Sequence, residues 1–122
     1  MTDVRSAIKC CVAVGESEGE KNVTLVRHLK RRGIDAQLVY GQGPDVVGDG
    51  FLIECKWDLL SKAVLDRLIG QLVGYMQRNH CRVFVVVYND AKYPLLVELV
   101  DFCRRQSYAP GVEVIVLRDV IK

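Results

Sequence analysis

The strongest constraint on the fold is an almost uninterrupted apolar run in the second half of the chain, Val83-Phe84-Val85-Val86-Val87. A strand with one face in water alternates apolar and polar residues, whereas this run has no polar face. We therefore expect a strand over 82–88 that is covered on both sides, as central and parallel strands are. Amphipathic helices are predicted before and after it, over 59–78 and 92–106. A strand between two helices favours an α/β fold with parallel pairing through crossover connections.

The remaining elements precede this unit, except for one final strand. In chain order we predict a helix over 3–14, a helix over 19–32, a strand over 34–40, a hairpin over 45–56 and a strand over 112–117. The alternating pattern after Lys9 leaves a strand possible at the end of the first helix. Trp57 and Asp58 are expected to leave the hairpin strand and approach the long helix, which Ser61 can cap. The order predicts one domain over residues 1–122, with a mixed sheet of about five strands and helices on both faces.

The hairpin carries charges that a purely structural hairpin does not need. Gly48-Asp49-Gly50 supplies a tight turn between two apolar arms. Folding at this turn brings Asp45, at the start of one arm, beside Glu54 on the other. Lys56 lies on the same side of the strand as Glu54, because side chains alternate with a period of two residues. Two carboxylates and an ammonium at one end of a short apolar sheet suit a hard divalent cation beside a water molecule.

Composition restricts the classes of function. Half of the 122 residues are hydrophobic, which is enough for a packed core and argues against disorder. The net charge is only +2, so any phosphate binding must come from a local patch. The basic cluster over 27–32 is either a solvated helix end that complements the helix dipole or such a patch. No apolar run approaches the roughly 20 residues of a membrane span, so we expect a cytoplasmic protein with no membrane partner.

The cysteines give little support to a zinc site. They are Cys10, Cys11, Cys55, Cys81 and Cys103, an odd number without any C-x-x-C spacing, and the chain has only two histidines. We expect reduced thiols that serve as small buried hydrophobic groups.

Pro44-Asp45 followed by Glu54-Cys55-Lys56 resembles the PD-(D/E)xK signature of the restriction-endonuclease-like nucleases. Downstream, Gln71 and Tyr75 match the Q-x-x-x-Y helix motif of the RecB-like and exonuclease branch of that superfamily. The similarity spans roughly residues 18–90, most of the chain. The resemblance implies an α/β fold with a restriction-endonuclease-like αβββαβ core, and the predicted order of elements is similar to it.

The resemblance also implies an activity, namely metal-dependent hydrolysis of phosphodiester bonds in DNA rather than RNA. Asp45, Glu54 and the backbone carbonyl of Cys55 would bind Mg²⁺ or Mn²⁺, which prefer oxygen ligands. The metal would polarise the scissile phosphate and lower the pKa of a bound water. Lys56 would orient that water and offset the charge that develops in the transition state.

Three further residues are implicated by the same resemblance. Many relatives add a glutamate from the first core helix, and Glu20 is the best candidate because it lies where the helix over 19–32 begins. Glu16 and Glu18 are alternatives that the spacing does not exclude. Gln71 and Tyr75 would face the site from the long helix, where Gln71 would contact a phosphate or a metal-bound water.

Several interpretations remain open from the sequence. Small single-domain members of the superfamily usually act as dimers, so a homodimer is expected. The size fits a structure-selective nuclease such as a Holliday-junction resolvase, whereas the Gln71 and Tyr75 motif favours an exonuclease. The alternative is a catalytically inactive nuclease-fold module for nucleic-acid binding or complex assembly. A nucleotide-binding domain is disfavoured, because no Gly-rich loop joins a strand to a helix.

Each candidate residue also has an ordinary structural interpretation. Asp45 follows a proline and suits a turn. Glu54 and Lys56 suit a same-face ion pair on a strand. Glu20 suits a charge at the start of a helix. On the long helix, Gln71 suits a position at the boundary of the core, and Tyr75 suits a core position.

Overall fold

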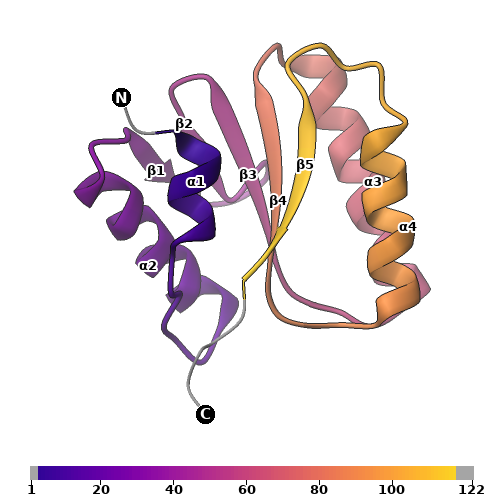
Figure 1. Ribbon diagram of the computed structural model, residues 1–122, viewed down its shortest axis with the longest axis horizontal. Coiled ribbons are helices and arrows are strands. Elements are labelled where there is room, and N and C mark those ends of the chain that lie inside the picture. The colour runs from indigo at the N-terminus through magenta and orange to yellow at the C-terminus, as the bar shows by residue number, and fades with distance from the viewer. Residues whose placement is uncertain (1–2, 118–122) are drawn as a thin grey trace.

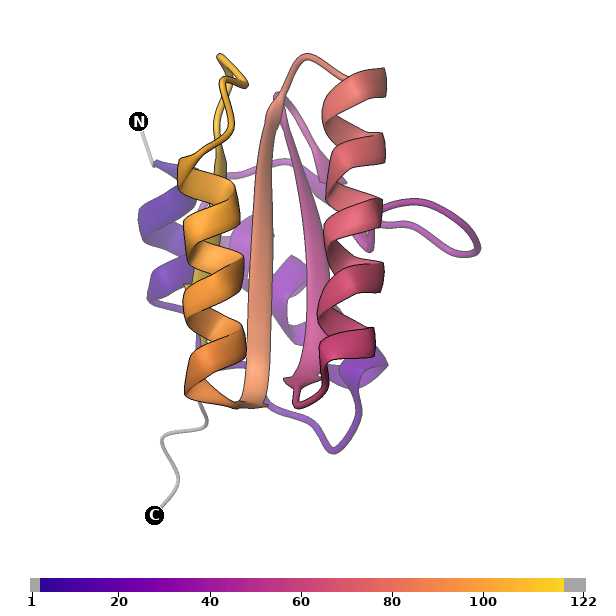
Figure 2. The same ribbon diagram turned by 90° about the vertical axis from the view of Figure 1, so that its right-hand side faces the viewer.

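A five-stranded mixed sheet lies at the centre of the protein, with two helices packed on each face (Figure 1; Figure 2). The computed structural model describes residues 3–117, apart from the Asn89 side chain. In chain order the elements are α1 (Val4–Lys9), α2 (Glu18–Arg31), β1 (Ala36–Leu38), β2 (Val46–Gly48), β3 (Phe51–Leu59), α3 (Lys62–Arg78), β4 (Arg82–Ala91), α4 (Tyr93–Arg104) and β5 (Val112–Val116). The predicted α/β class with a mixed sheet of about five strands is confirmed.

The strands follow one another across the sheet in chain order, β1-β2-β3-β4-β5. The first three form an antiparallel meander, in which Val46 of β2 pairs with Ile53 of β3. β3, β4 and β5 are parallel, with α3 and α4 as the crossovers between them. Because β3 and β4 run the same way, α3 must run back along the sheet in the opposite direction, as Figure 2 shows.

Two apolar cores lie on opposite faces of the sheet, and the apolar run of β4 contributes to both. Val83 and Val85 pack in the core beneath α3 and α4, whereas Phe84 and Val86 pack in the core beneath α1 and α2. All four are at most 1% exposed. Fully burying such a side chain stabilises a fold by about 1.5–3 kcal/mol. The prediction that this strand is covered on both faces is therefore confirmed.

The N-terminal helix is shorter than predicted. α1 ends at Lys9 rather than at residue 14, and the segment that follows is irregular. Cys11 and Ala13 are buried while Val12 and Val14 are exposed, which is the period of two that an extended chain produces. The β-branched valines favour this conformation over a continued helix.

The long helix begins later than predicted, because β3 continues through Trp57 and Asp58 to Leu59. A register shift lies between Lys56 and Asp58, after which Asp58 and Leu59 pair with the end of β4. This bulge turns Leu59 into the α3/α4 core, out of phase with the residues before it. α3 starts only after Ser61, whose hydroxyl accepts a hydrogen bond from the Val64 N–H at 3.2 Å, as the capping prediction expected.

Other boundaries differ by smaller amounts. β1 has only three residues of the predicted 34–40, and β4 extends three residues beyond 88, since its partner β3 is long. All five cysteines are free thiols, and three of them are buried; Cys10 is exposed. Among residues 3–117, no helix combines the length and the apolarity that crossing a membrane requires.

Candidate active site

The predicted proximity of Asp45 and Glu54 is found in the structure. The backbone N–H of Asp45 donates to the carbonyl of Ile53 at 3.0 Å, and its side-chain Oδ2 accepts from the N–H of Cys55 at 2.8 Å. Asp45 therefore contacts β3 on both sides of Glu54. Asp45 is half-buried and Glu54 is only 4% exposed.

Two carboxylates take the place of a neighbouring strand along this part of β3. Beyond the β2 pairing, the N–H groups of Cys55 and Trp57 donate to Asp45 Oδ2 and to Glu18 Oε2, the latter at 2.7 Å. In an extended strand the N–H and the C=O of one residue point to the same edge. The carbonyl of Cys55 therefore points to the edge at which these two carboxylates meet.

The Glu54 side chain lies on the face of the sheet that α3 covers. The hydroxyl of Tyr75 donates a hydrogen bond to Glu54 Oε1 at 2.7 Å, and both groups are buried. The Nζ of Lys56 lies 3.9 Å from Glu54 Oε2. Glu54 thus has one oxygen bound to a tyrosine and the other near a cation, beside the Asp45 carboxylate.

Burial, and after it the nearby Asp45 carboxylate, raise the pKa of Glu54 to about 7. The Tyr75 hydrogen bond and Lys56 oppose this rise. Burial also raises the pKa of Asp45 and of Glu18, each opposed first by the backbone N–H that its carboxylate accepts. Close carboxylates that are this poorly solvated favour binding of a proton or of a cation.

We expect Tyr75→Phe to destabilise the protein by about 1–3 kcal/mol at pH 8, and by less at pH 5. The lost hydroxyl leaves the Glu54 carboxylate without its donor, and this raises the pKa of Glu54 further. The cost is present above that pKa and shrinks below it, where the neutral acid is the native form. Urea unfolding at the two pH values measures the difference. An equal loss at both would show that the hydrogen bond does not favour the charged form.

Glu18, rather than Glu20, is the helix glutamate that the structure brings to β3. The exposed Glu20 carboxylate accepts the N–H of Glu16 at 2.7 Å, and its own N–H donates to Ser17 Oγ at 3.2 Å. These contacts close the N-terminus of α2. The Ser17-x-x-Glu20 spacing is that of a capping box, so the sequence already contained a reason to assign Glu20 to the cap. Glu16 has no side-chain contact with the site among the described residues.

Gln71 lies one helical turn before Tyr75 on α3. Four helix residues rise about 6 Å and two strand residues about 6.6 Å, and α3 runs against β3. If Tyr75 is level with Glu54, Gln71 is therefore level with Lys56. Its Oε1 atom is buried and has no hydrogen-bond partner within the described residues. An unpaired buried carbonyl oxygen costs about 1–3 kcal/mol, which a bound donor or cation would offset.

A buried polar cluster on the α2 face of β3 was missed by the sequence analysis. Lys21 is fully buried, with its Nζ 4.7 Å from the centre of the Trp57 ring and 5.9 Å from that of Tyr88. The Tyr88 hydroxyl lies 2.7 Å from Asn22 Oδ1 and 3.2 Å from Cys55 Sγ. This cluster holds α2, and with it Glu18, against the back of the strand that carries the site.

One signal in the sequence could have revealed this cluster. Lys21 precedes Leu25 and Leu29 at intervals of four residues, so it continues the apolar stripe of α2. Both leucines are fully buried. A lysine on such a stripe either is buried with the leucines or lies at the solvent-exposed end of the stripe. The packing of α2 against β3 shows that Lys21 is buried.

The oxygen atoms at this site fit a hard divalent cation. No group of three or more His, Cys, Asp or Glu side chains within residues 3–117 is arranged to hold a metal ion. Asp45, Glu54 and the Cys55 carbonyl nevertheless form a set of two carboxylates and one carbonyl. Mg²⁺ typically takes one or two carboxylates and completes its shell with water. Cys55 contributes no thiolate, because its sulfur is buried on the other face beside Tyr88.

Comparison with known proteins gives no further assignment. No family model matches the chain, and neither the curated proteins nor the solved structures contain a significant match to it.

Proposed function

We propose that the protein is a metal-dependent nuclease that hydrolyses phosphodiester bonds in DNA. The observation that carries the proposal is that Asp45 makes hydrogen bonds to β3 at Ile53 and at Cys55, the two neighbours of the buried Glu54. Lys56 lies on the same strand, beside Glu54. The order α2-β1-β2-β3-α3-β4 also agrees with the αβββαβ core that the motif residues implied. The contacts of Asp45 and Lys56 lie within residues 45–56, whereas the order of elements runs from Glu18 to Ala91.

The proposed roles follow from the contacts of each residue. Asp45, Glu54 and the Cys55 carbonyl hold Mg²⁺ or Mn²⁺, which when bound offsets phosphate charge and lowers the pKa of a water ligand. Lys56 lies next to Glu54 and donates hydrogen bonds to the attacking water or to a phosphate oxygen. The raised pKa of Glu54 means that cation binding displaces a proton near neutral pH.

Residues from the two flanking helices complete the proposed site. Glu18 replaces Glu20 as the acidic residue of α2, since it lies against β3 beside Asp45. Tyr75 orients Glu54 through its hydroxyl. Gln71 supplies a carbonyl oxygen that lacks a partner among the described residues and can accept a hydrogen bond from a bound water.

A second candidate is a non-catalytic DNA-binding or assembly module of the same fold. One observation favours it, namely that no three acidic side chains within residues 3–117 form a metal-holding group. Such a module would bind DNA without metal and would not cut it.

Linear, single-stranded and four-way-junction DNA distinguish an exonuclease from a junction-selective endonuclease.

The test is cleavage of these three labelled substrates with Mn²⁺ by the native protein and by Asp45→Asn. Asparagine still accepts the Cys55 N–H but loses the charge, so we expect the cleavage rate to fall about a hundredfold or more. Asp49→Asn is the matched control, because Asp49 is an exposed turn residue of the same hairpin and its loss should leave the rate unchanged. Native protein that folds and retains DNA but cuts none of the substrates would support the non-catalytic module.

A further inference from the structure

A stripe on the outer side of α4 remains uncovered within the described chain. It consists of Tyr93, Leu96, Val97, Val100 and Arg104, which we call the α4 stripe. Tyr93 is 76% exposed and Val97 is 45% exposed. Together with Asp101 these residues line a shallow groove of about 410 Å³. The intervals of four, three and four residues from Tyr93 to Arg104 are those of a helix that packs against another helix.

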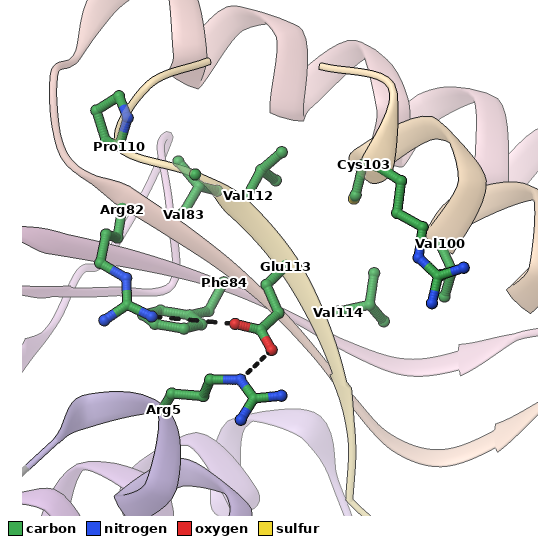
Figure 3. Close-up of a pocket in the computed structure, with 12 residues that line it drawn as sticks. Arg5, Arg82, Val83, Phe84, Val100, Cys103, Pro110, Val112, Glu113 and Val114 are labelled. Carbon is green, nitrogen blue, oxygen red and sulfur yellow. Dashed lines mark hydrogen bonds and ion pairs between the residues drawn. The ribbon is translucent and has the colours of Figure 1, made fainter. Parts of the chain in front are cut away.

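The α4 stripe continues into the outer edge of the sheet. A second cavity, of about 460 Å³, lies between α4 and β5 (Figure 3). Val100 and Cys103 of α4 line it together with Val112 and Val114 of β5. Val100 and Arg104 belong to both hollows, so they form one continuous flank.

β5 is the last strand of the sheet, and one of its backbone edges has no strand partner within residues 3–117. Its sequence Val-Glu-Val-Ile-Val has a high preference for strand pairing. The single charge, Glu113, is bound by Arg5 and Arg82 across the cavity (Figure 3). A strand edge of this kind is a template for pairing with another chain.

We propose that this flank is the interface of a two-fold symmetric dimer of this chain, in which β5 pairs antiparallel with its copy and the two α4 helices pack together. The inference does not depend on the proposed nuclease function. A second copy of the chain fits this flank because the flank is complementary to itself, both in geometry and in chemistry.

The first observation is geometric. α4 packs over β4 and β5, with Leu99 and Cys103 in contact with the core valines of these strands. A two-fold axis at the outer edge of β5 is then about one strand spacing, ~4.8 Å, from the axis of α4. The two copies of α4 would lie about 10 Å apart, which is the ordinary distance between packed helices.

The second observation is chemical. In an antiparallel helix pair, a two-fold axis midway between Val97 and Val100 is also midway between Tyr93 and Arg104. Valine then meets valine at the centre, and each Tyr93 ring meets a guanidinium of the other chain at the ends. Neither the Tyr93 hydroxyl nor the Arg104 guanidinium makes a side-chain hydrogen bond or an ion pair within the part of the chain that the structure describes. Arginine over a tyrosine ring is a favourable cation–π pair.

The dimer also has a consequence for the proposed nuclease, and this step rests on that function. A two-fold axis perpendicular to the sheet keeps both sites on the same side of the sheet. Five strand spacings separate the two copies of β3, so the sites would lie about 24 Å apart along the sheet.

Two charge variants of one exposed residue test the proposal. We expect native protein to have twice the 13.7 kDa mass of one chain by light scattering after size-exclusion chromatography. Val97→Lys and Val97→Asp should each show the mass of one chain, because like charges meet near the axis. An equal mixture of the two variants should recover the double mass as a mixed dimer.

The control is the same pair of substitutions at Val12, which is 50% exposed and lies in the loop after α1. Both should keep the double mass, and circular dichroism confirms folding of all four variants. Arg104→Ala gives a second readout, for which we expect about tenfold weaker dimerisation from the loss of two cation–π pairs. A monomeric native protein overturns the proposal, as does a Val97→Lys protein that stays dimeric or a mixture that stays monomeric.

Discussion

Glu54→Gln should abolish metal-dependent cleavage and yet make the protein more stable by about 3 kcal/mol at pH 8. The native pKa of Glu54 is raised to about 7 by burial and by Asp45. The neutral acid is therefore the form that the fold favours, and native stability falls as pH rises from the unfolded pKa through 7. Glutamine stays neutral and can still accept the Tyr75 hydrogen bond. At pH 5 the gain should shrink to about 1 kcal/mol, because the native acid is protonated there.

Urea unfolding at pH 5 and pH 8 without divalent ions measures this effect. Adding Mn²⁺ at pH 8 should raise the unfolding midpoint of the native protein, but not that of Glu54→Gln, because the neutral amide is a poor ligand. Glu16→Gln is the matched control, since Glu16 is exposed and outside the site, and it should behave as native in every assay. Equal stability of native and Glu54→Gln at pH 8 would show that the Glu54 charge carries no cost.

Lys56→Met should lower the cleavage rate about 10²–10³-fold while leaving Mn²⁺ binding intact. Methionine keeps most of the apolar stem but removes the ammonium 3.9 Å from Glu54. Lys56 lowers the pKa of Glu54 and of Asp45, so its loss leaves more uncompensated negative charge for a cation to neutralise. Thermal stabilisation by Mn²⁺ should therefore be equal to that of the native protein or larger.

Lys92→Met is the control, because the Lys92 side chain is exposed at the start of α4, and its backbone meets β3 at Leu59, beyond the hairpin residues 45–56. Its cleavage rate and its response to Mn²⁺ should match those of the native protein. If Lys56→Met instead loses the Mn²⁺ response and the cleavage together, Lys56 acts by shaping the site and not on the reacting phosphate. Cleavage at the native rate would exclude Lys56 from the chemistry.

These outcomes separate the proposed site from the proposed dimer. The residues of the hairpin lie on β2 and β3, whereas the flank lies two strands away at α4 and β5. The Val97 variants should therefore leave the Mn²⁺ response of each chain unchanged, and the Glu54 variant should leave the mass unchanged. Failure of the predictions for the site would therefore leave the dimer proposal standing, and failure of the predictions for the dimer would leave the site proposal standing.

Local patterns in the sequence determined much of the fold. The apolar run of β4 required cover on both faces, because no polar face was available to meet water. The glycine-flanked turn at Asp49 closed the hairpin, and so placed Asp45 near Glu54 from sequence separation alone. The i, i+4 spacing of Gln71 and Tyr75 put them on one side of α3. Each of these features depends only on residues that are close together in the sequence.

Tertiary structure alone decided the rest, because it depended on contacts between distant segments. Glu18 and Glu20 are two residues apart in the sequence. Glu18 is the one that reaches β3, because its carboxylate accepts the backbone N–H of Trp57, 39 residues further along the chain. The continuation of β3 to Leu59 followed from its pairing with the end of β4. The burial of Lys21 and the raised pKa of Glu54 arose from the loss of water when helices closed over both faces of the sheet. Solvation is a property of the assembled layers, and a linear pattern of residues does not contain it.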